Sequence, residues 1–307
     1  MTKTNSRRLR VMAKARPGAM PLPVRQDVHA FTKPEVFDRW SDEAAGLRAL
    51  ERGDNVITMF DVIGEDFWSG GGITAKTVAA QLRAIGPRPI EIQINSPGGD
   101  MFEGIAIFNV LREHPQPVTV KVMGMAASAA SVIAMAGDTI EIGASSFIMI
   151  HNCWIIAIGN RHDMAETAEW LEPFDQAMVD LYAARTGQDA KQVGKWMDAE
   201  TYMSGSQAIE RGFADTLLAA DAVTTDPDAK ASDRASNDLR SMELTLVSAG
   251  MSRGDARAKI KAIRGTPGAA PTEGTPGAAL EPPDGGTTQP KADDWSGLSG
   301  LLAIVQS

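Results

Sequence analysis

Three short segments of the sequence carry residue types that could perform nucleophilic chemistry if the fold brought them together. Gly98 and Gly99 follow an alternating strand, and two adjacent glycines let a backbone or an oxyanion approach closely. Ser128 joins a strand to a run of small residues that suits a helix, whose first free N–H groups favour negative charge. His151 ends the apolar strand 147–150. Taken alone, each feature is more typical of a turn, a helix cap or a structural histidine than of a catalytic group.

Taken together, these residues match the needs of a serine nucleophile. Such a serine requires a general base to take its proton and hydrogen-bond donors for the oxyanion. Ser128, His151 and the backbone amides of Gly99 and Ala129 would supply these parts. Because the base must be neutral, activity is expected to fall as the pH drops through the pKa of His151.

A carboxylate should orient the imidazole, and the segment 196–202 offers two. Asp198 and Glu200 are both candidates, and both are equally compatible with a role as solvated loop carboxylates. Ser131, one helical turn beyond Ser128, and Cys153 are expected only to pack.

The elements that must position these residues follow an α/β pattern. Alternating or apolar runs predict strands, and helix-like segments separate most of them, which favours a largely parallel sheet with crossover helices. The strands are predicted at 56–60, 90–94, 118–122, 140–142 and 147–150. The helices are predicted after 70–72, at 102–112, 126–136 and 163–185, the last with a kink at Pro173, and one or two more within 239–264, interrupted at Gly250 and Gly254.

Composition excludes several other classes of protein. The chain has 307 residues, 43% hydrophobic and 22% charged, which is ordinary for a protein with a substantial core. Its single cysteine excludes an internal disulfide and thiolate metal clusters, and its four histidines form no His-x-x-x-His pair. No apolar run reaches 18 residues, so we expect no membrane span. We therefore expect no metal and no other cofactor.

The chain divides into four predicted parts. Residues 1–50 are a basic, largely disordered extension, residues 51–220 are the α/β domain, and residues 221–264 are a partly helical extension. Residues 265–307 are a flexible tail rich in Gly and Pro with an apolar end. The net charge is −9, although residues 1–26 hold seven basic and no acidic side chains. A solvated terminus is favoured over a nucleic-acid contact for this basic segment.

From about Asn55 to Leu218 the chain resembles the ClpP serine peptidases, and in particular the head maturation proteases encoded by phages and prophages. The resemblance lies in Ile-Asn-Ser-Pro-Gly-Gly at 94–99, Gly-Met-Ala-Ala-Ser at 124–128, Met-Ile-His at 149–151, Tyr-Ala-Ala-Arg-Thr-Gly at 182–187 and Ala-Ile-Glu-Arg-Gly-Phe-Ala-Asp at 208–215. It implies the ClpP/crotonase-type ββα spiral, an α/β fold, with flexible extensions at both ends. The run 126–138 resembles the phage branch in particular.

The resemblance also implies roles for individual residues. Ser128 would be the nucleophile, His151 the general base, and the amides of Gly99 and Ala129 the oxyanion hole. Glu200 falls at the position of the family's triad aspartate, with Asp198 as the alternative. Substrate would pair with two edges, and the residues concerned are Gly98, Asp100, Met101 and Trp154.

For function, the resemblance implies a serine endopeptidase that assembles into a homo-oligomeric ring, to which the helix 163–185 contributes. Its protein substrates would be capsid or scaffold precursors, inside a bacterial host cell and within the phage procapsid. One alternative is a ClpP subunit working with an ATP-dependent unfoldase. Another is a capsid scaffold protein with a vestigial triad. Crotonase chemistry is disfavoured because that group uses no nucleophilic serine.

Overall fold

The computed structural model describes residues 33–44, 47–49, 53–218, 223–225 and 229–264. The chain divides into two units, residues 1–265 and 266–307, and the second lies outside the described residues. Most of the predicted extension 1–50 and the whole of the predicted tail 265–307 therefore lie outside the described residues. Within the described part, no helix is both long and apolar enough to cross a membrane.

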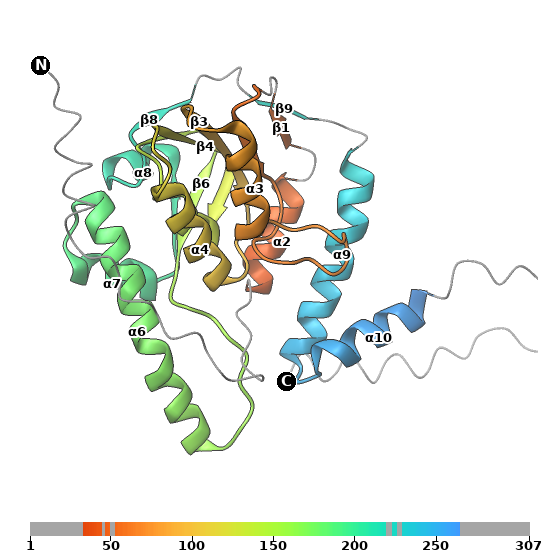
Figure 1. Cartoon of the computed structure of the whole chain (residues 1–307). Helices are drawn as coiled ribbons and strands as arrows, with labels where there is room; N and C mark the ends of the chain where they lie inside the picture. The colour runs from red at the N-terminus through yellow and green to blue at the C-terminus, as the bar shows by residue number, and fades with distance from the viewer. Residues whose placement is uncertain (1–32, 45–46, 50–52, 219–222, 226–228, 265–307) are drawn as a thin grey trace, which may run out of the picture. The chain divides into compact units, whose positions relative to one another are not determined.

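A seven-stranded sheet forms the centre of the first unit (Figure 1). Its strands are β2 (Val56–Met59), β3 (Ile90–Ser96), β4 (Val118–Ala127), β5 (Thr139–Ile142), β6 (Phe147–Ile150), β7 (Thr201–Ser204) and β8 (Thr216–Leu217). The order β2-β3-β4-β5-β8 is parallel throughout. A separate antiparallel pair joins β1 (Leu47–Ala49) to β9 (Val223–Thr225).

Strand β4 changes partners along its length, and this change creates the site described below. Its first half pairs with β5, from Thr119 to Val122, whereas Met125–Ala127 pair with β6. Antiparallel β7 then adds to the outer edge of β6. As a result, the ends of β4 and β6, which lead into Ser128 and His151, lie side by side.

The helices are α2 (Pro34–Ala44), α3 (Ala75–Ile85), α4 (Met101–Arg112), α5 (Ala129–Ala134), α6 (Arg161–Thr186), α7 (Ala190–Asp198), α8 (Gly205–Glu210), α9 (Ala229–Ser248) and α10 (Arg253–Arg264). The helix predicted at 126–136 starts later than expected, since Ala126 and Ala127 still belong to β4. Helix α6 runs through Pro173 without interruption. The predicted break at Gly250 is confirmed, but the one at Gly254 is wrong, because this glycine lies in the first turn of α10.

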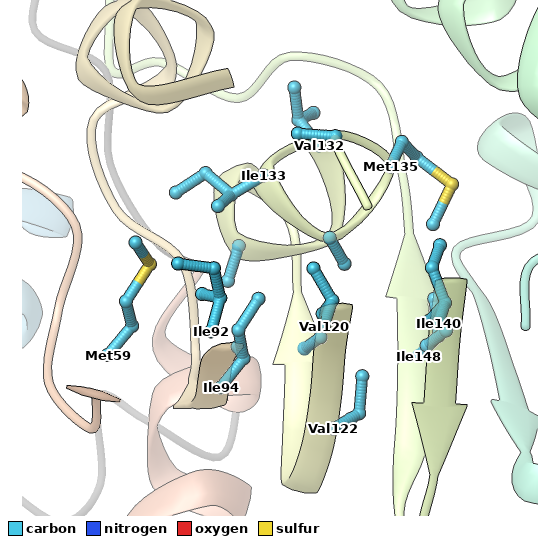
Figure 2. Packing of buried hydrophobic residues seen from close by; sticks show 14 of the residues in the cluster. Met59, Ile92, Ile94, Val120, Val122, Val132, Ile133, Met135, Ile140 and Ile148 are labelled. Atoms are coloured by element: carbon cyan, nitrogen blue, oxygen red, sulfur yellow. The ribbon is translucent and has the colours of Figure 1, made fainter. Parts of the chain in front are cut away.

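The alternation of side chains along the strands divides the core into two clusters. Figure 2 shows Ile92 and Ile94 of β3 and Val120 and Val122 of β4 on the side of the sheet where Ile133 of α5 lies. These five side chains are fully buried. Burial of each large apolar side chain contributes about 2 kcal/mol, so this layer contributes strongly to the stability of the sheet.

On the opposite face, buried apolar side chains gather near the carboxyl end of β4. There Met125, Ala127 and Met149 form a second buried cluster with side chains of α2, among them Phe37 and Trp40. Leu244 and Val247 of α9 join the same cluster. The two clusters hold the end of β4 between them, which makes the following turn a rigid point of the fold.

Candidate active site

Ser128 lies in a strained turn between β4 and α5. Its backbone has φ 53° and ψ −125°, a region that is uncommon for a residue with a side chain and that often marks functional sites. The turn is held from both sides, because the Ser128 N–H donates to the carbonyl of Met149 and the Ser128 carbonyl accepts from Ser131 N–H. The hydroxyl of Ser128 is thereby placed beside the first turn of α5.

His151 directly follows β6 and faces this hydroxyl. Its Nε2 lies 2.7 Å from Ser128 Oγ, and the side chain is only 8% exposed. Burial lowers the pKa of His151 to about 4; the charge of Glu200 raises it, and that of Lys33 lowers it further. The imidazole is therefore neutral at pH 7 and can accept the serine proton through Nε2.

Of the two candidate carboxylates, Glu200 is the one whose charge acts on His151. Glu200 follows α7 with φ 47°, and the pairing of β7 with β6 brings it beside the histidine. Its carboxylate forms an ion pair with Lys33, and within the described residues no hydrogen bond joins it to the imidazole. Asp198 is exposed and accepts a hydrogen bond from Asn152 Nδ2 at 2.9 Å.

The two amides predicted to form an oxyanion hole are both available. Ile63 accepts from Asp100 N–H at 2.9 Å and donates to the Gly98 carbonyl at 2.8 Å. Because successive amides of an extended segment point to opposite edges, this pairing turns the Gly99 N–H away from Ile63. Ala129 is the first residue of α5. In the described part of the chain, neither the Gly99 nor the Ala129 amide donates to an acceptor.

Gly98 and Gly99 permit approaches that no other residue would allow. A Cβ at Gly98, where φ is +90°, would lie 2.7 Å from Ser128 Cβ, and one at Gly99 would lie 2.1 Å from the Ile63 carbonyl oxygen. The glycine pair thus lets one backbone segment contact both Ser128 and Ile63.

A mainly apolar pocket opens beside Ser128 and His151. It encloses about 550 Å³ including its open mouth, and its walls include Met101, Trp154 and Trp170. Two of the predicted substrate-binding residues, Met101 and Trp154, thus line it. Gly98 lies against Ser128 just outside it. Asp100 lines a second pocket, and its carboxylate caps α4 by accepting from Phe102 N–H and Glu103 N–H.

Cys153 lies in the wall of the first pocket as a packing residue. Its Sγ contacts Met101 Sδ at 2.8 Å, and its N–H donates to Asp175 Oδ1 at 2.6 Å. Burial, together with the charge of Asp175, raises the pKa of the Cys153 thiol. The thiol is therefore protonated and a poor nucleophile at neutral pH.

Sequence reasoning missed three contributors to this arrangement. Ser131, expected only to pack, donates from its hydroxyl to the Ser128 carbonyl at 2.6 Å and lies 2.7 Å from the Tyr182 hydroxyl. Lys33 and Ile63 reach the site from segments with no recognisable motif. Only Ser131 carried a usable signal, because it is polar and one helical turn from Ser128.

Comparison with known proteins identifies the family of this chain. The signature of the Clp protease family matches residues 72–221. The ATP-dependent Clp protease proteolytic subunit of Deinococcus radiodurans is 31% identical over 150 residues, covering 47% of this chain and 74% of the relative. The subunit of Pleurastrum terricola is 34% identical over 130 residues, covering 42% and 66%.

Among solved structures, a variant of ClpP1 from Listeria monocytogenes matches with 23% identity and a TM-score of 0.45, covering 58% of this chain and 95% of its own. The sequence relatives carry the assignment, since the match to the Deinococcus subunit extends over 74% of that protein at 31% identity. On this evidence the chain belongs to the Clp protease family, a family of peptidases.

Proposed function

We propose that this chain is a serine-type endopeptidase with Ser128 as nucleophile, His151 as general base and Glu200 as the carboxylate that orients the histidine. The observation that carries the proposal is the 2.7 Å contact between His151 Nε2 and Ser128 Oγ. It joins a strained serine to a buried neutral base beside two available amides. Nucleophile, base and oxyanion donors are the minimum set for acyl transfer.

In the proposed reaction, His151 Nε2 takes the hydroxyl proton as Ser128 Oγ attacks the peptide carbonyl. The resulting oxyanion accepts hydrogen bonds from the amides of Gly99 and Ala129. The imidazolium then gives its proton to the leaving amine, and a water molecule, activated by the same histidine, hydrolyses the acyl-enzyme. The charge of Glu200 stabilises the imidazolium, consistent with its effect on the pKa of His151.

The substrate would bind as an extended chain. The edge of segment 98–101 that faces away from Ile63 is open to β-pairing, and Trp154 lies on the segment that would form the second edge. The apolar wall of the pocket favours an apolar side chain at the residue before the cleaved bond.

For the biological role, we propose the processing of capsid or scaffold precursors during phage head maturation, by a homo-oligomeric ring inside the bacterial host. Two features support this role over a housekeeping one. The run 126–138 resembles the phage branch, and the chain continues for 86 residues beyond the family match, including α9 and α10.

A second candidate is a proteolytic subunit that depends on an ATP-driven unfoldase. It is supported by the curated relatives, which are named as proteolytic subunits of ATP-dependent Clp proteases. Digestion of a folded protein only in the presence of a Clp unfoldase and ATP would favour this role. Digestion of unfolded capsid precursor by the purified chain alone would favour the first.

The test of the chemistry uses the full chain and the variants Ser128→Ala and Ser206→Ala, the latter removing an exposed serine of α8. Each is treated with a fluorophosphonate probe and analysed by intact and peptide mass spectrometry. We expect labelling at Ser128 in the wild type and in Ser206→Ala, and none in Ser128→Ala. Equal labelling of all three proteins, or a label at another residue, would refute the assignment. No labelling of any of them, even in assembled particles, would instead favour a scaffold protein with a vestigial triad.

A further inference from the structure

The hairpin of α9 and α10 is anchored to the segment that precedes α3, and it lies beyond residue 221, where the family match ends. Arg240 of α9 makes the central contact. Its guanidinium binds Asp66 in a bidentate manner, with Nε 3.1 Å from Oδ1 and Nη2 2.8 Å from Oδ2. Nη2 also lies 2.9 Å from Asp61 Oδ1, and Nη1 donates to Asn237 Oδ1 at 2.6 Å.

The contact between Arg240 and Asp66 is buried. Arg240 is 8% exposed and the side chain of Asp66 is 7% exposed. Burial alone would raise the pKa of Asp66, but the hydrogen bonds from Arg240 and Ser69, together with the charge of Arg240, hold it below its usual value. Removal of one partner of such a pair leaves a buried charge without compensation.

A second anchor lies one helical turn further along α9. Trp68 Nε1 donates to Glu243 Oε2 at 2.5 Å, and Glu243 is paired in turn with Arg257 of α10 at 3.0 Å. Two cations of α10 lie over the ring of Phe67. Arg257 Cζ is 4.2 Å and Lys261 Nζ is 4.6 Å from the ring centroid. Both helices of the hairpin thus hold the segment 61–69.

The held segment contains the residue that pairs with the backbone of the candidate oxyanion hole. Ile63 lies between Asp61 and Asp66 and makes the two backbone hydrogen bonds that orient segment 98–100. Gly99 belongs to both pockets. On one side it meets Ser128 and His151, and on the other it meets the pocket lined by Ile63, Asp66 and Arg240. Arg240 therefore holds Asp66, and the short chain segment 63–66 joins Asp66 to Ile63, whose backbone hydrogen-bonds the residues on either side of Gly99.

We infer that Arg240 is a positioning residue for the peptidase reaction: it holds the segment 61–69 so that Ile63 directs the Gly99 N–H toward the oxyanion. The inference rests on the proposed function, since it assigns to the C-terminal hairpin a part in the same site. It predicts a defect in transition-state stabilisation rather than in substrate binding, because the ground-state carbonyl makes weaker hydrogen bonds to these donors than the oxyanion does.

The experiment compares full-length wild type with Arg240→Gln, Arg240→Lys and the control Arg112→Gln. Arg112 is a half-buried arginine of α4 that binds Asp138 at 3.3 Å and the Ala136 carbonyl at 3.2 Å, away from both pockets. Two measurements are made: hydrogen–deuterium exchange of peptides covering 61–70 and 97–104, and hydrolysis of the aminomethylcoumarin amide of acetyl-dileucine.

We expect Arg240→Gln to speed exchange in both peptides about 10-fold and to lower kcat about 10-fold or more with KM changed less than about 2-fold. Arg240→Lys should lie between wild type and Arg240→Gln in both its exchange rates and its kcat. Arg112→Gln should behave as wild type. Trp68→Phe, which removes the hydrogen bond to Glu243 but keeps an aromatic ring beside Phe67, serves as a milder variant if Arg240→Gln does not fold. It should shift exchange in 97–104 in the same direction.

The inference would be overturned if Arg240→Gln and Trp68→Phe both showed wild-type exchange in 97–104. It would also be overturned if the kcat of Arg240→Gln were no lower than that of Arg112→Gln. Failure of the proposed function has a different signature. In that case Ser128→Ala would hydrolyse the peptide as fast as wild type, while the exchange experiment, which needs no activity, would still decide whether the hairpin holds segment 97–104.

Discussion

Lys33 and Glu200, 167 positions apart in the sequence, form an ion pair beside His151. The histidine therefore experiences two opposite charges, because Glu200 raises its pKa and Lys33 lowers it. The carboxylate proposed to orient the imidazole is thus shared with a lysine at the start of α2.

Replacement of this lysine should change the pH dependence of the enzyme. In Lys33→Met the pKa of His151 should rise, since the nearby positive charge is lost and Glu200 remains. The acid limb of kcat/KM should then move to higher pH. Lys121→Met is the matched control, because Lys121 pairs with Glu91 at 2.7 Å on the sheet, away from the pocket of the site. An acid limb that stays at its wild-type pH in Lys33→Met would contradict the shared-carboxylate arrangement.

The wild-type pH profile follows from the burial of His151. With its pKa lowered to about 4, the base stays neutral at mildly acidic pH, so kcat/KM should be flat from pH 7 to about 5 and fall below that. A limb near pH 6.5 would show that the free enzyme does not hold His151 as the structure describes.

The same group should make the free energy of unfolding depend on pH. Between pH 6.5 and 4 the unfolded chain binds a proton that the native His151 does not, so the native state loses stability as the pH falls through this window. This loss of stability amounts to about 3 kcal/mol and is complete below the folded-state pKa of His151. Urea unfolding of wild type and His151→Gln at pH 7 and pH 4.5 measures it. Between pH 7 and pH 4.5 the variant should lose less stability than wild type. Equal losses would count against a lowered pKa of His151.

Glu200 and Asp198 can be separated by isosteric variants. Glu200→Gln should lower kcat by about 10²-fold or more, because a neutral amide no longer stabilises the imidazolium. Asp198→Asn should stay within about 2-fold of wild type, since Asp198 is exposed and bonded to Asn152. Steady-state hydrolysis of the same coumarin peptide provides the comparison, and the reverse order of effects would make Asp198 the orienting residue.

Gly99→Ala should abolish activity and lower the free energy of unfolding by about 3 kcal/mol or more, because the new Cβ would lie 2.1 Å from the Ile63 carbonyl oxygen. Gly187→Ala is the control. Gly187 also has a positive φ, +73°, but nothing lies within 4 Å of its Cβ position, so the cost should be about 1 kcal/mol with activity retained. Similar losses in the two variants would show that backbone strain alone, and not the contact with Ile63, explains the need for glycine.

Tyr182→Phe tests the hydrogen bonds behind the nucleophile. The change leaves the Ser131 hydroxyl bound to the Ser128 carbonyl but without its tyrosine partner. The free energy of unfolding should fall by about 1 kcal/mol. The rate of fluorophosphonate labelling should also fall, because the turn that carries Ser128 is held less firmly. A variant with lower stability but an unchanged labelling rate would make Tyr182 a purely structural residue.

The sequence by itself determined those parts of the fold and site whose causes are local. The alternation of apolar residues at 90–94 and 118–122 specifies half-buried strands, and both appear within β3 and β4. Gly98 and Gly99 indicated a close backbone approach, which the structure contains. The strand patterns that precede Ser128 and His151 likewise placed both residues at strand ends. The carboxyl ends of parallel strands meet at one edge of a sheet.

Only the tertiary structure decided which distant groups surround this core of the site. The ion pair of Lys33 with Glu200, the pairing of Ile63 with segment 98–100 and the anchoring of Asp66 by Arg240 each join segments without a shared motif. Such contacts depend on how β4 divides its partners between β5 and β6 and on where α2 and α9 cover the sheet. Local periodicity predicts that an element forms, but the burial of its apolar face against a particular neighbour decides which charged side chains meet.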